Sequence, residues 1–325
     1  MERTMENSYK NVRSFGARGN GCGDDTAAIQ EAFDSVRETG GTVFFPAGVY
    51  PITKCLLYYS NMRLVFENGA VLLRANDTMM YILANHTTSD QGGYSATSNV
   101  EIIGATFDGN AEIDYKGTLL NNSHLSDLRV RDCKFRNGHT WHFYECNSSK
   151  YVTVDNCIFE NSMRGSKQSE YIQLDSALIG AYGTTPICPD DTVCSHITIS
   201  NCRFECSGFS PAIGNHSQKK HNNIKIYNNS FIGGSGDRGN IDFMSSVHSL
   251  NVYGNSFENA EKGIWHTDSL PVPKSVTDVA AYLRENVHYD YERAWFVHGN
   301  RFTNVRVPFA TDIVGCGNLV DGKTV

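Results

Sequence analysis

The sequence lacks any apolar run long enough to form a transmembrane helix. Residues 1–11 also lack the apolar segment of a signal peptide, so we expect a cytoplasmic protein, with secretion or a phage-associated location as alternatives. Positive charge is scarce, because 28 Lys and Arg stand against 35 Asp and Glu, a net charge of −7. This balance argues against nucleic acid or an anionic membrane as the main partner.

Metal-binding motifs are absent as well. The chain contains no CxxC pair and no HExxH, and its 11 His residues are scattered, so we expect no metal ion and no cofactor. Of its 10 Cys residues, four fall at positions that we expect to be buried, as free thiols that suit a reducing compartment: Cys133, Cys146, Cys157 and Cys202. Cys188 and Cys194 are the one pair whose spacing would permit a loop-closing disulfide.

One pattern recurs along the chain, in which a short β-prone run ends in two small or polar residues, followed by any residue and then Phe. Successive Phe residues are 28, 24, 45, 27, 26 and 45 positions apart: Phe107, Phe135, Phe159, Phe204, Phe231, Phe257 and Phe302. The short steps fit a solenoid with a coil of roughly two dozen residues, and the long steps fit a coil with an insertion of about twenty.

The repeat is β rather than α, because apolar residues alternate before each Phe, as in Val152/Val154 and Ile224/Ile226. Strands at the same point of every coil would stack into a parallel sheet with tiers about 4.8 Å apart. Crossovers in such sheets are almost always right-handed, so we predict an all-β, right-handed parallel β-helix. Equivalent residues would then form ladders through the stack: Cys133, Cys157, Cys202, Asn229, Asn255 and Asn300.

We expect a single domain over residues 1–325, since a solenoid grows in one dimension. Within residues 12–50, an amphipathic helix is predicted to start at Asp24-Asp25-Thr26, to end at Gly40-Gly41 and to cap the open apolar end of the coils. A strand over Thr42–Phe45 then begins the first coil. Insertions at 160–196 and 262–294 should wall a groove, and the second should hold a short helix near 275–287.

The segments SFGARGNGCGDDTAAIQEAF and GGTVFFPAGVY resemble the start of the pectate-lyase-like superfamily, which includes the relatives of family 28 glycosidases. The resemblance implies a capping helix and the first coil of a parallel β-helix. It does not choose a reaction, because the superfamily contains hydrolases, lyases, fructan transferases, epimerases and phage tailspikes. Several motifs of a standard polygalacturonase are missing: an NTD triplet, GHG and RIK.

A second strand precedes each ladder strand and should present a polar surface. We align its tiers on residues that we expect to point inward: Phe143, Ile172, Ile213, Ile241 and Ile264. One outward column then reads Tyr144, Gln173, Gly214, Asp242 and Trp265, and the next reads Cys146, Asp175, His216, Met244 and Thr267. In this alignment Gly214 leaves a gap that a sugar ring could occupy.

Asp175 is the preferred catalytic residue, with Asp242 or Glu170 as its partner, because glycosidic hydrolysis needs an acid and a base or nucleophile. Strand geometry puts the Cα atoms of Asp175 and Asp242 on the order of 11 Å apart, which suits the inverting mechanism better than the retaining one. Glu170 would lie roughly 16 Å from Asp175 on a straight strand. His216, one tier from Asp175, would adjust its pKa or bind a hydroxyl group.

The runs SEYIQLDSA and AIGNHSQKKHNNIKIYNNSF are also similar to a bacterial subgroup of this superfamily. That resemblance implies functional positions at Glu170, Gln173, Asp175, His216, Lys220 and His221. Together with the aromatic side chains expected on the same face, it suggests a set of substrate-binding residues: Gln173, Lys220, His221, Tyr144, Tyr171, Trp265 and His266.

We therefore predict an enzyme that cleaves glycosidic bonds of an oligo- or polysaccharide, by carboxylate acid/base hydrolysis or intramolecular glycosyl transfer. Two alternatives stay open. The first is β-elimination by a metal-free lyase with Lys220, His221 or Tyr171 as the base. The second is a non-catalytic, tailspike-like β-helix that binds carbohydrate. A homo-oligomer such as a trimer is also left open.

Overall fold

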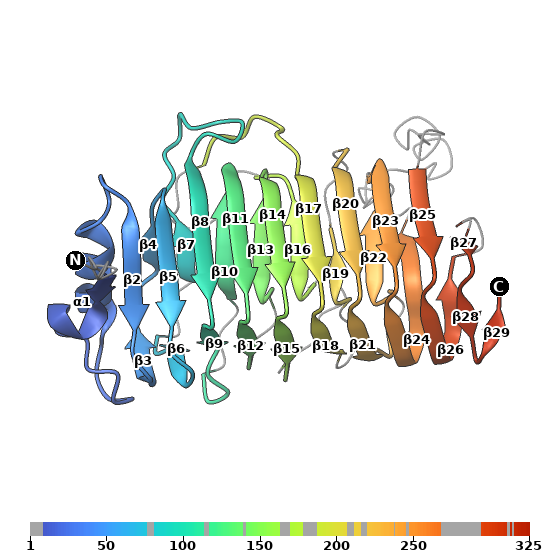
Figure 1. The fold of residues 1–325 in the computed structure, drawn as a ribbon, viewed down its shortest axis with the longest axis horizontal. Coiled ribbons are helices and arrows are strands. Elements are labelled where there is room, and N and C mark those ends of the chain that lie inside the picture. The colour runs from blue at the N-terminus through green and yellow to red at the C-terminus, as the bar shows by residue number, and fades with distance from the viewer. Residues whose placement is uncertain are drawn as a thin grey trace, which may run out of the picture.

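The strands of this chain stack coil upon coil along one axis, with the described N-terminal elements at one end and the C-terminus at the other (Figure 1). The computed structural model describes residues 9–76, 81–113, 117–138, 141–162, 170–177, 187–206, 211–215, 220–236, 238–244, 247–267, 294–310, 313 and 315–325. The protein is a right-handed parallel β-helix, as the alternating apolar pattern predicted.

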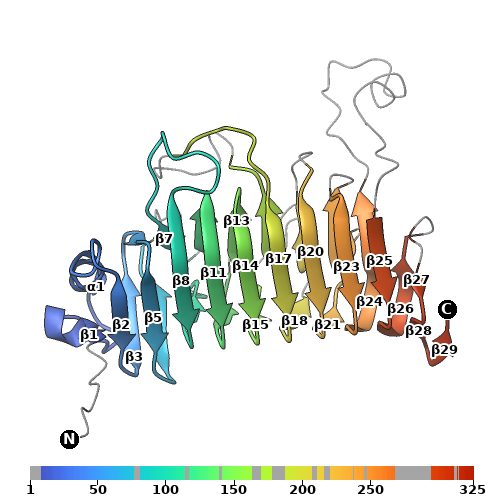
Figure 2. The same ribbon diagram turned by 45° about the horizontal axis from the view of Figure 1, so that its top comes forward.

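Within the described residues, the first sheet contains 11 strands that pair in parallel. In order along the axis they are β1 (Tyr9–Asn11), β2 (Gly41–Phe45), β5 (Met62–Phe66), β8 (Thr97–Ile103), β11 (Leu125–Arg131), β14 (Lys150–Asp155), β17 (Ser195–Ser200), β20 (Asn222–Tyr227), β23 (Ser249–Tyr253), β25 (Ala294–His298) and β27 (Gly315–Cys316). Figure 2 shows the middle strands of this sheet side by side, from β8 to β25.

The part of the second sheet that the structure describes contains 18 strands in two lines. One line is β3 (Gly48–Ile52), β6 (Ala70–Arg74), β9 (Thr106–Asp108), β12 (Lys134–Arg136), β15 (Ile158–Glu160), β18 (Arg203–Cys206), β21 (Ser230–Gly233), β24 (Ser256–Thr267), β26 (Arg301–Phe309) and β28 (Leu319–Val320), closed by the antiparallel β29 (Lys323–Thr324). The other is β4 (Leu56–Tyr58), β7 (Tyr81–Asn85), β10 (Thr118–Ser123), β13 (Tyr144–Asn147), β16 (Ile172–Asp175), β19 (Ile213–Gly214) and β22 (Ile241–Met244). Strand β24 joins the two lines, because it pairs with both β21 and β22.

The Phe residues of the repeat form the stack that the sequence predicts. Neighbouring ring centroids are 4.7 to 4.9 Å apart and the ring planes differ by 3° to 11°. Every ring is fully buried: Phe107, Phe135, Phe159, Phe204, Phe231, Phe257 and Phe302. The spacing equals one tier of a parallel sheet, so the two long steps in the sequence are insertions that leave the coil register intact.

The Asn ladder is also confirmed. The backbone N–H and the side-chain Nδ2 of Asn229 both donate to Oδ1 of Asn255, at 2.9 and 3.0 Å. Asn255 donates in the same way to Asn300, at 3.0 and 2.9 Å. The backbone N–H of Cys202 donates to Asn229 Oδ1 at 2.8 Å, so the buried Cys ladder continues the Asn ladder. Cys188 and Cys194 are free thiols in this structure.

The N-terminal helix α1 (Thr26–Asp34) follows a short 3-10 helix, η1 (Val12–Phe15), and buries Ile29, Ala32 and Phe33. It ends at Asp34, before the predicted Gly40, because the Val36 N–H donates to the Phe33 carbonyl and tightens the last turn. The helix expected near 275–287 lies outside the described residues. No helix in the described part of the chain is long and apolar enough to span a membrane.

Candidate functional site

The predicted polar surface lies on the outer side of β10, β13, β16, β19 and β22. Ile172, Ile213, Ile241 and Ile264 are in register and fully buried, as expected. Their neighbours along the strands therefore point outward, and one column reads Asn121, Glu145, Gln173, Gly214, Asp242 and Trp265. The next column contains Asn147 beside Asp175.

The tier at residues 142–147 differs from the prediction by one residue. Tyr144, not Phe143, pairs with Ile172. Tyr144 is fully buried, and its hydroxyl donates to Asn122 Oδ1 inside the coil. The expectation that Tyr144 faces a substrate is therefore wrong, and Glu145 takes the outward position instead.

Glu145 was not among the predicted site residues. Its carboxylate accepts hydrogen bonds from Thr118 Oγ1 at 2.8 Å and from Asn121 Nδ2 at 2.9 Å. The residue is only 5% exposed. Burial raises the pKa of Glu145, with a smaller contribution from the charge of Asp175, while His142 and the two donors oppose the shift.

Asp175 lies one tier from Glu145 and two residues further along its strand. Gln173 Nε2 donates to its Oδ2 at 3.2 Å, and the Ser176 backbone N–H donates to its Oδ1 at 2.8 Å. Both oxygens thus receive a hydrogen bond, an arrangement that stabilises the charged carboxylate.

Glu170 and Asp242 are held by one cation, Arg238. Its Nη1 lies 2.6 Å from Glu170 Oε1 and its Nε lies 3.1 Å from Asp242 Oδ2. Both carboxylates are fully buried and the arginine side chain is 14% exposed. Burial lowers the pKa of Arg238, but the charges of Glu170 and Asp242 outweigh it and raise that pKa overall.

The gap expected at Gly214 is filled by this ion cluster. A Cβ atom added to Gly214 would lie 3.0 Å from Glu170 Cγ and 2.4 Å from the Asp242 carbonyl oxygen. Gly214 is therefore needed for the close approach of Glu170 and Arg238. It leaves no room for a sugar ring.

His142 connects the two parts of the site. Its Nε2 lies 3.8 Å from Glu145 Oε1, and its Nδ1 lies 3.6 Å from Glu170 Oε2. A continuous row of ionisable groups thus runs across four tiers, and we call the face that carries it the carboxylate face: Glu145, Glu170, Asp175 and Asp242, with His142 and Arg238 between them.

Some of the predicted binding residues lie elsewhere. His221 is fully buried beside β20, where its Nδ1 accepts the Cys194 N–H at 2.9 Å. Burial lowers the pKa of His221 to about 3, so its ring is neutral at ordinary pH. Tyr171 is also buried, and its hydroxyl donates to the Glu205 carbonyl at 2.9 Å. These two placements contradict the expectation of direct contact with a substrate.

The remaining predicted residues are more accessible. Lys220 is exposed, and Trp265 is half-buried at the far end of the outward column. His266 is also half-buried, but it pairs with the inward-facing Phe243 and therefore does not belong to that column. Lys262 Nζ lies 4.2 Å from the centre of the Trp265 ring. His216 lies outside the described residues. Within the ranges that the structure describes, no group of three or more His, Cys, Asp and Glu side chains is arranged to hold a metal ion.

Comparison with known proteins identifies relatives of several kinds. Plasmin and fibronectin-binding protein A of Streptococcus pneumoniae is 28% identical over 265 residues, 71% of this chain and 37% of that protein. Mannuronan C5-epimerase AlgE1 of Azotobacter vinelandii is 37% identical over 111 residues, 31% of this chain and 8% of the epimerase. The chain thus spans little more than a third of the first relative and far less of the second.

Solved structures share the fold. The S. pneumoniae surface adhesin PfbA aligns with a TM-score of 0.71 and 20% identity, over 96% of this chain and 79% of that one. An exopolygalacturonase from Thermotoga maritima aligns with a TM-score of 0.64 and 15% identity, over 98% of this chain and 80% of that one. The expected cytoplasmic location gains no support from these relatives, since one of them is a surface adhesin.

Residues 9–172 match the family described as rhamnogalacturonase A/epimerase, pectate lyase-like. This match covers half of the chain, and it includes the capping helix and the first part of the carboxylate face. The protein therefore belongs to the rhamnogalacturonase A/epimerase family of pectate-lyase-like β-helix proteins.

Proposed function

We propose that this protein hydrolyses glycosidic bonds of a polysaccharide at the carboxylate face, with Glu145 as general acid and Asp175 as general base. The observation that carries the proposal is the contrast between these two neighbouring carboxyl groups. Burial raises the pKa of Glu145, which favours its protonated form. Both carboxyl groups accept a hydrogen bond on each oxygen, but the donors differ. The Thr118 hydroxyl can also accept a hydrogen bond from a protonated Glu145, whereas the Gln173 and Ser176 N–H groups can only donate to Asp175, which favours its charged form.

The separation of the two residues suits inversion. One tier and two residues of strand put their Cα atoms about 8 Å apart. Inverting glycosidases need about 6.5–9.5 Å between the two carboxyl groups, so that a water molecule fits beside the base. Glu145 would protonate the leaving oxygen while Asp175 takes a proton from the attacking water.

Asp242 and Glu170 then have a supporting role rather than the catalytic one predicted from the sequence. Arg238 forms ion pairs with both, and burial keeps both carboxylates out of contact with solvent. His142 lies between Glu170 and Glu145, and through this imidazole the cluster holds the Glu145 carboxyl group in position. These residues position the acid, in our proposal, and do not touch the substrate.

The substrate class follows from charge and from the relatives. Asp175 is negative and Glu170 and Asp242 share a single cation, Arg238, so the carboxylate face has an excess of negative charge that favours a neutral sugar unit at the reacting centre. The relatives include an exopolygalacturonase and a mannuronan epimerase, so polysaccharides that contain uronates are the first candidates. The surface adhesin among them supports an extracellular or surface location for this chain too.

A second candidate function is carbohydrate binding without catalysis. Glu145 and Asp175 are each only 5% exposed, less than an open catalytic groove would require. The fold likeness to a surface adhesin points the same way.

Product analysis separates these functions. Rhamnogalacturonan, polygalacturonate and mannuronan are incubated with the protein, and reducing ends and ultraviolet-absorbing unsaturated sugars are measured. Hydrolysis gives reducing ends alone, and Glu145→Gln and Asp175→Asn should each lower the rate by roughly 100-fold or more. The exposed Glu258 on β24 provides the control Glu258→Gln, which should keep full activity.

Three results would count against the proposal. Full activity in both variants would remove Glu145 and Asp175 from the mechanism. Unsaturated products would assign a lyase. Saturable binding of a polysaccharide with no product of either kind would favour the non-catalytic function.

A further inference from the structure

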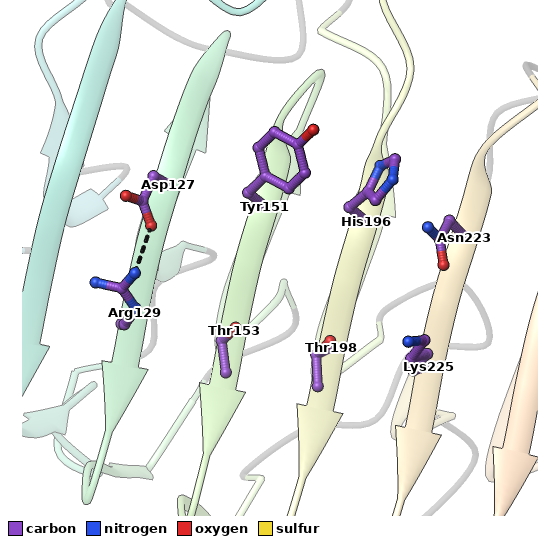
Figure 3. Close-up of a pocket in the computed structure, with 8 residues that line it drawn as sticks. All are labelled: Asp127, Arg129, Tyr151, Thr153, His196, Thr198, Asn223 and Lys225. Carbon is purple, nitrogen blue, oxygen red and sulfur yellow. Dashed lines mark ion pairs between the residues drawn. The ribbon is translucent and has the colours of Figure 1, made fainter.

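The outer side of the first sheet carries a polar hollow, separate from the carboxylate face, on the strands β11, β14, β17 and β20 (Figure 3). Its volume is about 250 Å³. Two rows of side chains line it, and both belong to the sheet that does not contain the carboxylate face. This volume is just below the range of about 300–1,000 Å³ that is usual for small-molecule sites, which suits a short oligosaccharide.

The upper row has an unusual backbone. It continues a column of left-handed residues with φ between 52° and 59°, one in each of six successive tiers: Asn61, Asn99, Asp127, Tyr151, His196 and Asn223. Asn, Asp and His tolerate this conformation, whereas a Tyr residue there is strained. Tyr151 and His196 thus occupy positions where the rest of the column has Asn or Asp.

Strain that persists at a surface position indicates a use for the side chain. Tyr151 is 52% exposed, so burial of its ring does not compensate for the backbone. Its ring centroid lies 4.9 Å from that of His196, and the two planes are tilted by 52°. Figure 3 shows both rings standing at the upper edge of the hollow. Lys150 Nζ lies 5.5 Å from the centre of the Tyr151 ring, and aromatic rings of this kind combine an apolar body with a polar tip.

The lower row supplies charge and hydroxyl groups. Arg129 lies at one end and Lys225 at the other, with Thr153 and Thr198 between them in register. Arg129 forms an ion pair with Asp127 at 3.1 Å. Among the described residues, no acidic side chain lies within ion-pair distance of Lys225. The hollow therefore has an excess of positive charge in a chain whose net charge is −7.

We propose that this hollow is a second binding site, distinct from the carboxylate face, for an oligosaccharide that carries uronate groups. A sugar ring would stack on Tyr151 and His196, its hydroxyls would bond to Thr153 and Thr198, and a carboxylate would pair with Lys225. Arg129 and Lys225 are three tiers apart, about 14 Å, which a chain of three sugar units along the axis would span. The site would hold an anionic polysaccharide on the outside of the β-helix while the carboxylate face remains free.

The test measures binding of trigalacturonate by calorimetry, in the Asp175→Asn background so that no turnover interferes. Tyr151→Asn should weaken binding about tenfold through loss of stacking. The same variant should keep or raise the thermal unfolding midpoint, because Asn is favoured at positive φ. His196→Asn and Lys225→Gln should also weaken binding, and the neutral maltotriose should bind at least tenfold more weakly than trigalacturonate.

The outcomes are distinct from those of the proposed hydrolysis. Unchanged trigalacturonate affinity in Tyr151→Asn and Lys225→Gln would overturn the second site, even if the wild-type protein hydrolyses a polysaccharide. Equal affinity for maltotriose would overturn its anionic specificity. Binding that needs Tyr151 and Lys225 would support the site even if no glycosidic bond is ever cleaved.

Discussion

The Arg238 guanidinium lies 2.6 Å from the fully buried Glu170 carboxylate. The same guanidinium also forms an ion pair with Asp242, four residues further along the chain. Replacing the arginine with Met would leave two buried carboxylates without their cation, and breaking a buried pair in this way costs about 3–5 kcal/mol. We expect Arg238→Met to lower the free energy of unfolding at pH 7 by that amount, measured by urea denaturation.

Two measurements show whether the loss is electrostatic. Arg203→Met removes an exposed pair with Glu205 and should cost less than about 1 kcal/mol. Lowering the pH protonates carboxylates, so the stability gap between Arg238→Met and the wild type should narrow in acid. A gap that stays constant with pH would mean that Arg238 acts through packing alone.

The Asn ladder should be a major source of stability. Asn255→Ala removes the acceptor for two donors of Asn229, and it also removes the donor to the Ile226 carbonyl at 3.0 Å. Each buried polar group left without a partner costs about 1–3 kcal/mol. We expect a loss of about 3 kcal/mol or more in urea denaturation.

The matched control for the ladder is Asn251, on the strand that precedes Asn255. Asn251 is half-buried on β23, where its Oδ1 lies 3.2 Å from His298 Nε2. Asn251→Ala should cost less than about 1 kcal/mol, since water replaces that contact. Equal losses in the two variants would contradict a special role for the ladder.

The ladders and the core were predictable because they repeat. Phe107 to Phe302 recur with the same flanking pattern, and a ladder position is fixed by many tiers at once. The alignment of Ile172, Ile213, Ile241 and Ile264 was correct for the same reason. Because the same alternation of apolar residues recurs in successive tiers, it specifies which face of each strand is buried.

The tier at 142–147 was not predictable, because Phe143 and Tyr144 are adjacent and both are buried. Phe143 packs edge-on against Tyr171 at the corner before the strand, with ring centroids 5.0 Å apart. A buried tyrosine needs a partner for its hydroxyl, and Asn122 provides it from the tier below. The local sequence around Tyr144 does not show this partner. Alternation from Phe143 therefore places Glu145 on the inner face of the strand, which is wrong.

The Arg238 cluster was missed for a different reason. Arg238 lies in a turn before β22, outside the strand pattern, and it meets Glu170 only because the intervening tier has Gly214. Contacts across two tiers depend on the size of the residue between them. Alternation carries no information about such contacts.

The buried His221 predicts a pH dependence of stability. Its pKa is lowered to about 3 in the folded protein, whereas an unfolded His titrates near 6.5. Between these values the unfolded chain binds the extra proton, so stability falls as the pH drops from about 6.5 toward 3. The contribution is about 1.4 kcal/mol per pH unit, or about 2 kcal/mol between pH 7 and pH 5.

The variant His221→Asn isolates the contribution of His221 to the pH dependence of stability. The Asn side chain can still accept the Cys194 N–H through its oxygen, as His221 Nδ1 does. The free energy of unfolding of the variant should therefore change by about 2 kcal/mol less than that of the wild type between pH 7 and pH 5. Identical pH profiles would place the acid sensitivity in other groups.

The position of His142 predicts a shift in the pH dependence of hydrolysis. Its imidazole lies 3.8 Å from Glu145 and lowers the pKa of that carboxyl, against the larger effect of burial. In His142→Gln this opposing influence is gone, so the pKa of Glu145 rises and the acid form persists to higher pH. The alkaline limb of kcat/KM, which reports loss of the proton from the general acid, should move to higher pH. His298→Gln, on β25 of the first sheet, should leave that limb unchanged, and a shift of the limb to lower pH in His142→Gln would contradict Glu145 as the acid.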